Sequence, residues 1–195
     1  MNIYIIPKVI ETYKKQYEYS VEYKLIDFLN YVFKNCKIEV LINKKINIRE
    51  GLIVISGGNT IKKFSKKKCD IVRDKIDSFY FNQFLKNKKK IKILAICHGA
   101  QFVSNKFNSN LFYSRKKNHI KPHEIIFGNR RLKVNSFHNI IIKKVKNNLK
   151  VLAIAKDKTI EAFIHKEMNI LGMIWHPERN KKFKEFDKNL IKKYL

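Results

Sequence analysis

One cysteine occupies a position typical of a nucleophile in an α/β protein. The apolar run 91–96 ends in Cys97, and Gly99 follows two residues later, where a helix-compatible segment begins. This pattern predicts a buried strand that turns sharply into a helix, with the sulfur exposed above the sheet. The positive end of the helix favours a reactive thiolate and offers N–H groups to an oxyanion. A buried structural cysteine fits the same stretch, so Cys97 alone leaves both interpretations open.

The segment His176-Pro177-Glu178 can supply a base and the group that orients it. Residues i and i+2 of an extended chain point to the same side, and Pro177 restricts itself and the preceding residue to extended geometry. The imidazole and the carboxylate are therefore predicted side by side at the end of an apolar strand, as a catalytic base requires. For these three residues alone, a surface turn without a catalytic role is the better interpretation.

Two successive glycines, Gly57 and Gly58, follow the apolar run 52–56. Glycine permits a positive φ and leaves backbone N–H groups uncovered, as an anion-binding turn requires. An ordinary tight turn is the simpler interpretation of the pair on its own.

The apolar patterns that position these residues predict an α/β fold. Strands are expected at 2–6, 38–42, 52–56, 91–96 and 170–175, and helices at 21–34, 69–85, 99–107 and 183–194, with a loop at 8–19. Alternating segments at 124–127, 132–135, 149–155 and 159–163 are typical of β-hairpins. We therefore expect a single domain over residues 1–195, with a mostly parallel central sheet, helices on both faces and an antiparallel hairpin extension.

The chain is strongly basic, with 43 Lys and Arg residues against 16 Asp and Glu residues and a net charge of +27. The lysines are scattered in short runs, and no arginine-rich arm accompanies them, so a nucleic-acid partner is not expected. The composition favours a basic, solvated surface with a modest preference for anionic small molecules.

The cysteine and histidine spacing predicts neither a disulfide framework nor a cofactor. Cys36, Cys69 and Cys97 form no CxxC pair, and the six histidines are widely spaced, so no metal site is expected. No apolar stretch approaches membrane-spanning length and no signal peptide is evident. The sequence therefore predicts a soluble cytoplasmic protein without a membrane partner.

Taken together and in this order, the segments resemble the class I glutamine amidotransferase superfamily, and within it the γ-glutamyl hydrolase-like (peptidase C26) branch. The matching segments are 55–59, 73–74, 96–101, 134–138 and 172–178. The resemblance implies the flavodoxin-like fold of that superfamily. It also implies a catalytic triad in which Cys97 attacks, His176 transfers the proton and Glu178 orients His176.

The same resemblance implies the groups that surround the triad. The backbone N–H groups of Gly58 and His98 would form an oxyanion hole. The substrate-binding residues that it implies are Gly57, Gln101, Ser136, Phe137 and His138. Two positions depart from the family pattern: Ala95 replaces a glycine before the nucleophile, and Asn59-Thr60 replaces a turn that usually contains Asp. These departures concern the identity of the substrate more than the catalytic groups.

The remaining histidines are weaker candidates for the site. His119 and His123, with Arg115 and Lys121, lie in a segment expected to cover the site, where they can meet an anionic leaving group. His165 is predicted at the surface.

The implied reaction is hydrolysis of a γ-glutamyl amide through a γ-glutamyl thioester, and its leaving group stays open. The segments 174–179 and 136–139 look like those of members associated with bacterial surface polysaccharide synthesis, one of whose activities acts on a nucleotide-linked substrate, γ-glutamyl-CDP-amidate. The branch also contains γ-glutamyl-γ-aminobutyrate hydrolases, so a small amine is equally open as the leaving group. A glutaminase subunit that delivers ammonia to a partner synthase is the alternative. A catalytically silent basic binding module is a third interpretation, which the intact Cys97, His176 and Glu178 oppose.

Overall fold

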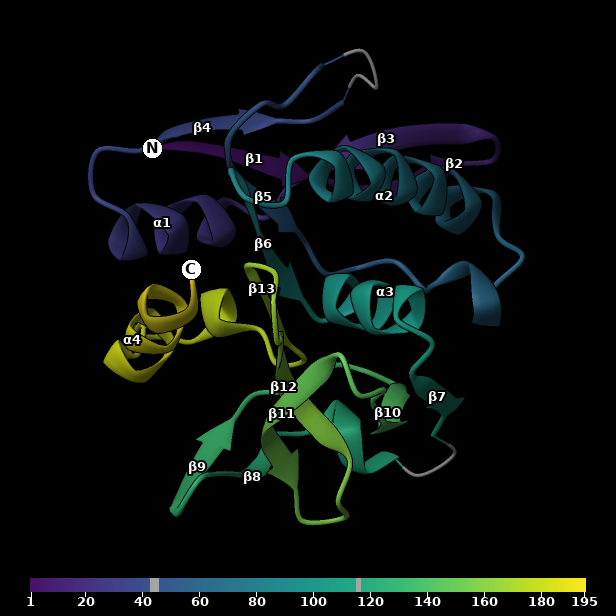
Figure 1. The fold of residues 1–195 in the computed structure, drawn as a ribbon. Coiled ribbons are helices and arrows are strands. Elements are labelled where there is room, and N and C mark those ends of the chain that lie inside the picture. The colour runs from purple at the N-terminus through teal and green to yellow at the C-terminus, as the bar shows by residue number, and fades with distance from the viewer. Residues whose placement is uncertain (43–45, 115–116) are drawn as a thin grey trace.

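Among the residues that the structure describes, a mixed sheet of 11 strands organises the fold (Figure 1). The computed structural model describes residues 1–42, 46–114 and 117–195. The strand order is β4-β1-β5-β6-β13-β12-β11-β8-β9, with β10 paired to β12 and β7 paired to β10. One edge of the sheet is parallel and the other is antiparallel, as the sequence predicts for an α/β protein with a hairpin extension.

The parallel half forms the centre of the fold. Its strands are β4 (Lys37–Val40), β1 (Asn2–Ile6), β5 (Gly51–Ile55), β6 (Ile91–Ile96) and β13 (Ile170–Met173). The middle strands are continuous apolar runs because both of their faces are covered by helices. The carboxyl ends of β5, β6 and β13 lie next to one another, so the residues that follow them meet at one edge.

In the described part of the chain, the α-helices α1 to α4 cover the two faces of this half (Figure 1). On one face, α1 (Tyr23–Val32) and α4 (Glu185–Tyr194) pack against one hydrophobic cluster. On the other face, α2 (Lys68–Lys86) and α3 (His98–Lys106) pack against a second cluster. Three 3₁₀ helices complete the helical content of the described residues: η1 (Lys62–Phe64), η2 (Lys117–Ile120) and η3 (Pro177–Arg179). None of the helices among these residues has the length and apolar character needed to cross a membrane.

The antiparallel half contains two strands that the sequence analysis missed. Its strands are β12 (Ile160–His165), β11 (Leu149–Ala155), β8 (His123–Phe127), β9 (Arg130–Val134), β10 (Ile140–Lys144) and β7 (Asn110–Tyr113). The strands β7 and β10 were not expected because their short segments lack the alternation that distinguishes a half-buried strand from a loop. They pair with each other over residues 110–113 and 140–144.

The prediction of a loop at residues 8–19 is wrong. These residues form a separate hairpin of β2 (Lys8–Tyr13) and β3 (Gln16–Ser20). Most of its side chains are exposed, so the hairpin carries no apolar alternation that a sequence pattern could reveal. The side chain of Asn59 anchors it, because Oδ1 accepts from the N–H of Val9 at 2.8 Å and Nδ2 donates to the Val9 carbonyl at 2.8 Å.

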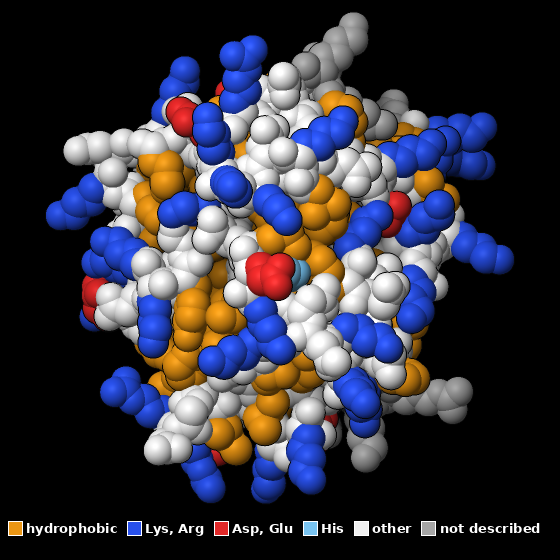
Figure 2. Space-filling view, in the orientation of Figure 1, with side chains coloured by type: hydrophobic (Ala, Val, Ile, Leu, Met, Phe, Trp, Pro, Cys, Tyr) orange, Lys and Arg blue, Asp and Glu red, His pale blue; other side chains and the backbone are white. Residues whose placement is uncertain are grey.

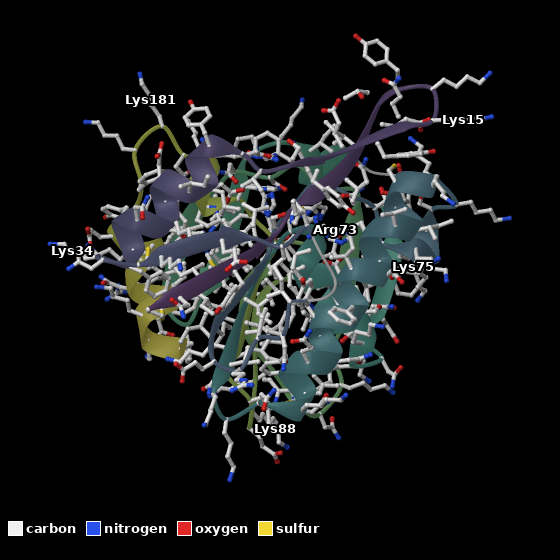
Figure 3. All side chains as sticks on the ribbon, turned by 90° about the horizontal axis from the view of Figure 1, so that it is seen from above. Lys15, Lys34, Arg73, Lys75, Lys88 and Lys181 are labelled. Carbon is white, nitrogen blue, oxygen red and sulfur yellow. The ribbon has the colours of Figure 1, made fainter. Side chains whose placement is uncertain are left out.

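The basic side chains are distributed over the surface rather than gathered in one patch, as Figure 2 shows for one face. Figure 3 shows the labelled lysines projecting outward, whereas Arg73 lies inside the molecule. The distribution of lysine agrees with the expected solvated surface. The buried arginine requires a separate explanation, which the candidate site provides.

Candidate active site

Cys97 lies at the corner between β6 and α3, as the sequence predicts. Its backbone has a φ of 50° and a ψ of −102°, a strained conformation for a residue with a side chain. Its N–H donates to the Met173 carbonyl at 2.7 Å, and its carbonyl accepts from the Gln101 N–H at 3.0 Å. The neighbouring strand and the helix therefore hold the strained residue, whose side chain lines a pocket.

Gly99 explains why the corner can be so tight. A Cβ atom at Gly99 would lie 2.1 Å from the carbonyl oxygen of Ile55, a distance at which the backbone would have to move. Any larger residue would push α3 away from β5, so the close packing of the helix and the strand requires glycine at this position. Ala95, the departure noted in the sequence, is fully buried in β6.

His176 and Glu178 follow β13 and are both buried, with exposed fractions of 2% and 3%. Their contact is short: His176 Nδ1 lies 2.6 Å from Glu178 Oε1. Burial alone would lower the pKa of His176, but the Cys97 sulfur beside it and the Glu178 carboxylate raise that pKa to about 10. The arrangement fits an imidazolium that faces the sulfur on one side and a carboxylate on the other.

Two further residues fix the position of the imidazole. The side chain of Asn135 accepts from the His176 N–H at 2.9 Å and donates to the His176 carbonyl at 2.7 Å. A Cβ atom at Gly57 would lie 2.4 Å from His176 Cε1, so only glycine leaves room for the ring. Gly57, predicted to bind substrate, is thus placed against the candidate base. Asn135 was not singled out from the sequence, although it stands in a segment that carries the family resemblance.

Gly58 and His98 are the residues predicted to supply an oxyanion hole. Gly58 has a φ of 116°, which favours glycine, and it lines the same pocket as Cys97. His98 is the first residue of α3, and the first N–H groups of a helix have no acceptor within that helix. Both positions are therefore compatible with a negatively charged oxygen held beside the Cys97 sulfur.

The side chain of His98 belongs to a buried network that the sequence analysis did not foresee. Its Nε2 lies 2.8 Å from Asp77 Oδ2, and its Nδ1 lies 2.8 Å from the carbonyl oxygen of Asn59. Asp77 also accepts from Arg73 Nε at 2.8 Å. Burial alone would raise the pKa of Asp77, but Arg73 and His98 hold it below its ordinary value. The i,i+4 spacing of Arg73 and Asp77 in α2, and the place of Arg73 in a segment that carries the resemblance, were the available signals.

Arg73 connects this network to the glycine turn. Its guanidinium donates to the carbonyl oxygen of Pro7 at 2.6 Å and to that of Ser56 at 2.9 Å. The Ser56 hydroxyl in turn donates to the carbonyl oxygen of Ile6 at 2.7 Å. The turn 56–59 is therefore held at Ser56 by Arg73 and at Asn59 by His98, which fixes the backbone of Gly58 between them.

The pocket beside Cys97 has a volume of about 250 Å³. Of the predicted substrate-binding residues, Gln101, Phe137 and His138 line it. Gln101 is buried, and its Nε2 donates to the carbonyl oxygen of Ile140 at 3.0 Å, so it supports the stretch 137–140 from below. Ser136 is fully buried, and its hydroxyl donates to the His119 carbonyl instead of facing the pocket.

Arg179 is a pocket residue that the sequence analysis did not assign to the site. It lies over the Phe137 ring, with Cζ 5.0 Å from the ring centroid, and it forms a two-point ion pair with Glu22. Its guanidinium therefore presents a fixed positive charge at the pocket wall. Its position directly after the His-Pro-Glu segment was the signal that could have drawn attention to it.

The residues expected to meet an anionic leaving group are placed elsewhere. Arg115 lies outside the described residues. His119 and His123 line a different cavity and point toward Glu161. The prediction of a surface position for His165 is wrong, because this residue is 7% exposed and its ring packs 4.8 Å from that of Phe107.

Comparison with known proteins identifies a family model, relatives and a shared fold. The Peptidase C26 family model matches residues 116–178. A gamma-glutamyl-CDP-amidate hydrolase from Campylobacter jejuni is 41% identical over 127 residues, which cover 65% of this chain and 62% of that protein. The chain thus matches less than two thirds of that relative's length. A subunit of the glutamine-hydrolysing GMP synthase from Pyrococcus abyssi is 28% identical over 134 residues, which cover 65% of each protein.

A solved structure shows the shared fold. A glutamine amidotransferase from Thermotoga maritima superimposes with a TM-score of 0.67 over 98% of this chain and 84% of that chain, at 15% identity. At this identity the likeness concerns the fold alone. The resemblance and the fold class predicted from the sequence are confirmed.

Proposed function

We propose that this chain, which has the fold of the class I glutamine amidotransferases, hydrolyses a γ-glutamyl amide through a thioester on Cys97. The observation that carries the proposal is the strained, buried Cys97 at the β6–α3 corner beside His176. The short contact of His176 with buried Glu178 supports a catalytic function for the pair. The similarity to γ-glutamyl and glutamine-hydrolysing relatives supports the same chemistry.

In the first half of the reaction, the Cys97 thiolate attacks the amide carbonyl carbon of the γ-glutamyl group. The oxygen becomes negatively charged and is stabilised by the N–H groups of Gly58 and His98. The C–N bond then breaks, and the His176 imidazolium gives its proton to the leaving amine. The products of this half are the free amine and a γ-glutamyl thioester on Cys97.

In the second half, water attacks the thioester carbonyl and His176 accepts the proton of the water. The C–S bond breaks, glutamate leaves and the thiolate–imidazolium pair is restored. Glu178 holds Nδ1 of His176 throughout, so the opposite nitrogen stays directed at the reacting atoms. Gln101, Phe137 and His138 would contact the glutamyl portion in the pocket.

For the leaving group, we propose a nucleotide-linked amine, with γ-glutamyl-CDP-amidate as the substrate. The support is the 41% identity to the Campylobacter jejuni hydrolase named for that substrate, together with Arg179 at the pocket wall. An arginine held in place by Glu22 suits a phosphate, because the N–H groups of Arg179 that do not donate to Glu22 are left for its oxygens. Such a substrate would connect the enzyme with surface polysaccharide synthesis.

The second candidate is a glutaminase subunit that supplies ammonia to a partner synthase. It is favoured by the similarity to the Pyrococcus abyssi GMP synthase component, which is itself named as one subunit of a glutamine-hydrolysing synthase. The two candidates share Cys97, His176 and Glu178 and differ in what departs with the nitrogen.

Glutamate release measured from three substrates separates these candidates. The assay compares γ-glutamyl-CDP-amidate, glutamine and γ-glutamyl-γ-aminobutyrate, with Cys97→Ala as the matched control for contaminating activity. We expect the highest kcat/KM for the nucleotide-linked substrate and inhibition of the others by cytidine nucleotides, weakening as salt is added. A preference for glutamine would establish the glutaminase instead. Release of glutamate from none of the three would favour the silent binding module.

A further inference from the structure

Three histidines and a glutamate meet inside the antiparallel half, away from the triad. We call this group, made of His119, His123, His138 and Glu161, the histidine cluster. The four residues come from η2, from β8, from the connection between β9 and β10, and from β12. His119, His138 and Glu161 have exposed fractions of 3%, 4% and 0%, and the side chain of His123 is 17% exposed. The fold therefore brings together histidines that the sequence analysis considered too widely spaced for a metal.

Three histidine nitrogens surround Glu161 Oε1 without forming hydrogen bonds with it. Glu161 Oε1 lies 3.4 Å from His119 Nδ1, 3.4 Å from His123 Nε2 and 3.7 Å from His138 Nε2. These three nitrogens and both Glu161 oxygens are buried and have no hydrogen-bond partner among the described residues. A buried carboxylate that accepts no hydrogen bond is costly, so three imidazoles at 3.4–3.7 Å leave the centre incomplete as it stands.

The separations between Glu161 Oε1 and the histidine nitrogens are close to the spacing of ligands around a metal ion. Charge-assisted hydrogen bonds between nitrogen and a carboxylate are shorter, about 2.7–2.9 Å. Nitrogen and oxygen ligands at zinc distances on the corners of a tetrahedron are about 3.3–3.4 Å apart. The ligand atoms of His119, His138 and Glu161 all lie within 4.8 Å of one another, and His123 Nε2, which is outside that group of three, lies 3.4 Å from Glu161 Oε1.

The opposite nitrogen of each imidazole is held from outside the cluster. His119 Nε2 lies 2.9 Å from Asp157 Oδ2, and His138 Nδ1 lies 2.9 Å from the carbonyl oxygen of Ile140. His123 Nδ1 lies 3.3 Å from the carbonyl oxygen of Lys121. Because each of these acceptors requires a proton on the outer nitrogen, a neutral ring presents its lone pair to the centre. Metal-binding histidines are usually fixed in this way.

We propose that the histidine cluster is a zinc site with His119, His123, His138 and Glu161 as its four ligands. Imidazole and carboxylate ligands suit zinc, and four protein ligands with no open position are typical of a structural site. A cavity of about 420 Å³ beside His119 and His123 provides access from the solvent. The competing explanation is that protonated imidazoles neutralise Glu161 without any metal.

The site would hold the wall of the active-site pocket in place. The carbonyl oxygen of His119 accepts from the Ser136 hydroxyl and, at 3.0 Å, from the N–H of His138. His138 itself lines the pocket next to Phe137. A metal bound to His119 and His138 would thus hold the stretch 136–140 both through His138 itself and through the His119 carbonyl to which this stretch donates. Metal binding does not depend on the proposed function, because its ligands do not include Cys97 or His176.

The test measures metal directly. Protein purified without a histidine tag or chelators should contain close to one zinc per chain by elemental mass spectrometry. After removal of the metal, zinc is titrated into the Cys97→Ala protein, so that the candidate nucleophile cannot act as a competing thiolate ligand. We expect saturable binding of one equivalent and a rise in the melting temperature with zinc. Absence of both zinc in the purified protein and saturable binding would overturn the proposal in favour of protonated imidazoles.

Substitutions inside the histidine cluster, compared with one outside it, test which residues bind the zinc. His123→Gln, the least buried ligand, and Glu161→Gln should each weaken zinc binding on the order of 10²-fold or more, as loss of a direct ligand exceeds the usual cost of losing an outer partner. His165→Asn is the matched control, since it removes another buried histidine and should bind zinc like the parent. Equal affinity in all three variants would place the zinc elsewhere.

A spectroscopic measurement remains decisive if the variants do not fold. Cobalt(II) loaded into the otherwise unchanged chain in place of zinc should give the intense visible absorption of a tetrahedral site. The weak absorption of an octahedral cobalt ion would overturn the four-ligand site.

Discussion

The molecule contains two buried groups of ionisable residues that differ in how many of their polar atoms have hydrogen-bond partners. In the Cys97 corner, made of the triad, the turn 56–59 and the Arg73–Asp77–His98 network, most buried polar atoms have a partner. Among its described side chains, only Glu178 Oε2 lacks one. In the histidine cluster, five buried atoms have no hydrogen-bond partner among the described residues. Buried polar groups in native proteins normally form hydrogen bonds. The first group finds its partners within the chain, whereas the second is the group for which we propose a bound zinc ion.

The largest expected effect is a loss of kcat from a substitution in the Cys97 corner that leaves the histidine cluster unchanged. Cys97→Ala should lower kcat by about 10⁴-fold or more, because removal of a nucleophile removes the covalent path. Zinc content should not change. A glutamine-directed electrophile should label Cys97 in the parent protein, with Cys69→Ala as the control that keeps its labelling. Retained turnover in Cys97→Ala would contradict the proposed triad.

The next effect concerns the orientation of the base. Glu178→Gln should lower kcat on the order of 10²-fold, because the amide no longer stabilises the charged imidazole. Loss of the imidazolium should end activity as the pH rises through about 10, the raised pKa of His176 in the parent. In Glu178→Gln this alkaline limit should move to lower pH, since one of the groups that raise this pKa is gone.

Glu167→Gln provides the control for Glu178→Gln. It removes a carboxylate from an exposed position and should leave both kcat and the alkaline limit unchanged. If the alkaline limit stayed in place in Glu178→Gln, a group other than Glu178 would be responsible for the high pKa of His176.

The next prediction concerns the stability that the Arg73–Asp77–His98 network provides. Asp77→Asn leaves the buried guanidinium of Arg73 without its charge partner, and should lower the free energy of unfolding by about 3 kcal/mol. Urea unfolding measures this change. Asp74→Asn makes the same substitution on the same helix, at a less buried position outside this network, and should stay within about 0.5 kcal/mol of the parent. Equal stability of the two variants would mean that the network does not support the turn.

The smallest effect is expected from the histidine cluster. Removal of zinc should raise KM several-fold with little change in kcat, because the stretch 136–140 lines the pocket while the triad belongs to other elements. Glutamate release from metal-free and reloaded protein measures this difference. A fall in kcat as large as that of Glu178→Gln would mean that the metal takes part in the chemistry, and the two regions would no longer be separable.

Local patterns in the sequence predicted the elements that carry the triad. The apolar run before Cys97, the nearby Gly99 and the strand before His176 are short-range signals, and the structure has the expected strands and helices there. The resemblance to known amidotransferases rested on the same segments and is confirmed by the comparisons. The assignment of catalytic roles to Cys97, His176 and Glu178 stays a prediction until the variants are measured.

The sequence by itself thus determined the parallel half of the sheet, because apolar periodicity and glycine positions act over a few residues. Only the tertiary structure decided the hairpin at 8–19, the contact of His98 with Asp77 and the histidine cluster. The members of that cluster are distant in sequence, and their side chains meet only if the antiparallel strands pair in the observed register. A shift of one residue would turn Glu161 to the opposite face of the sheet. Register depends on packing throughout the sheet, and no local pattern in the chain specifies it.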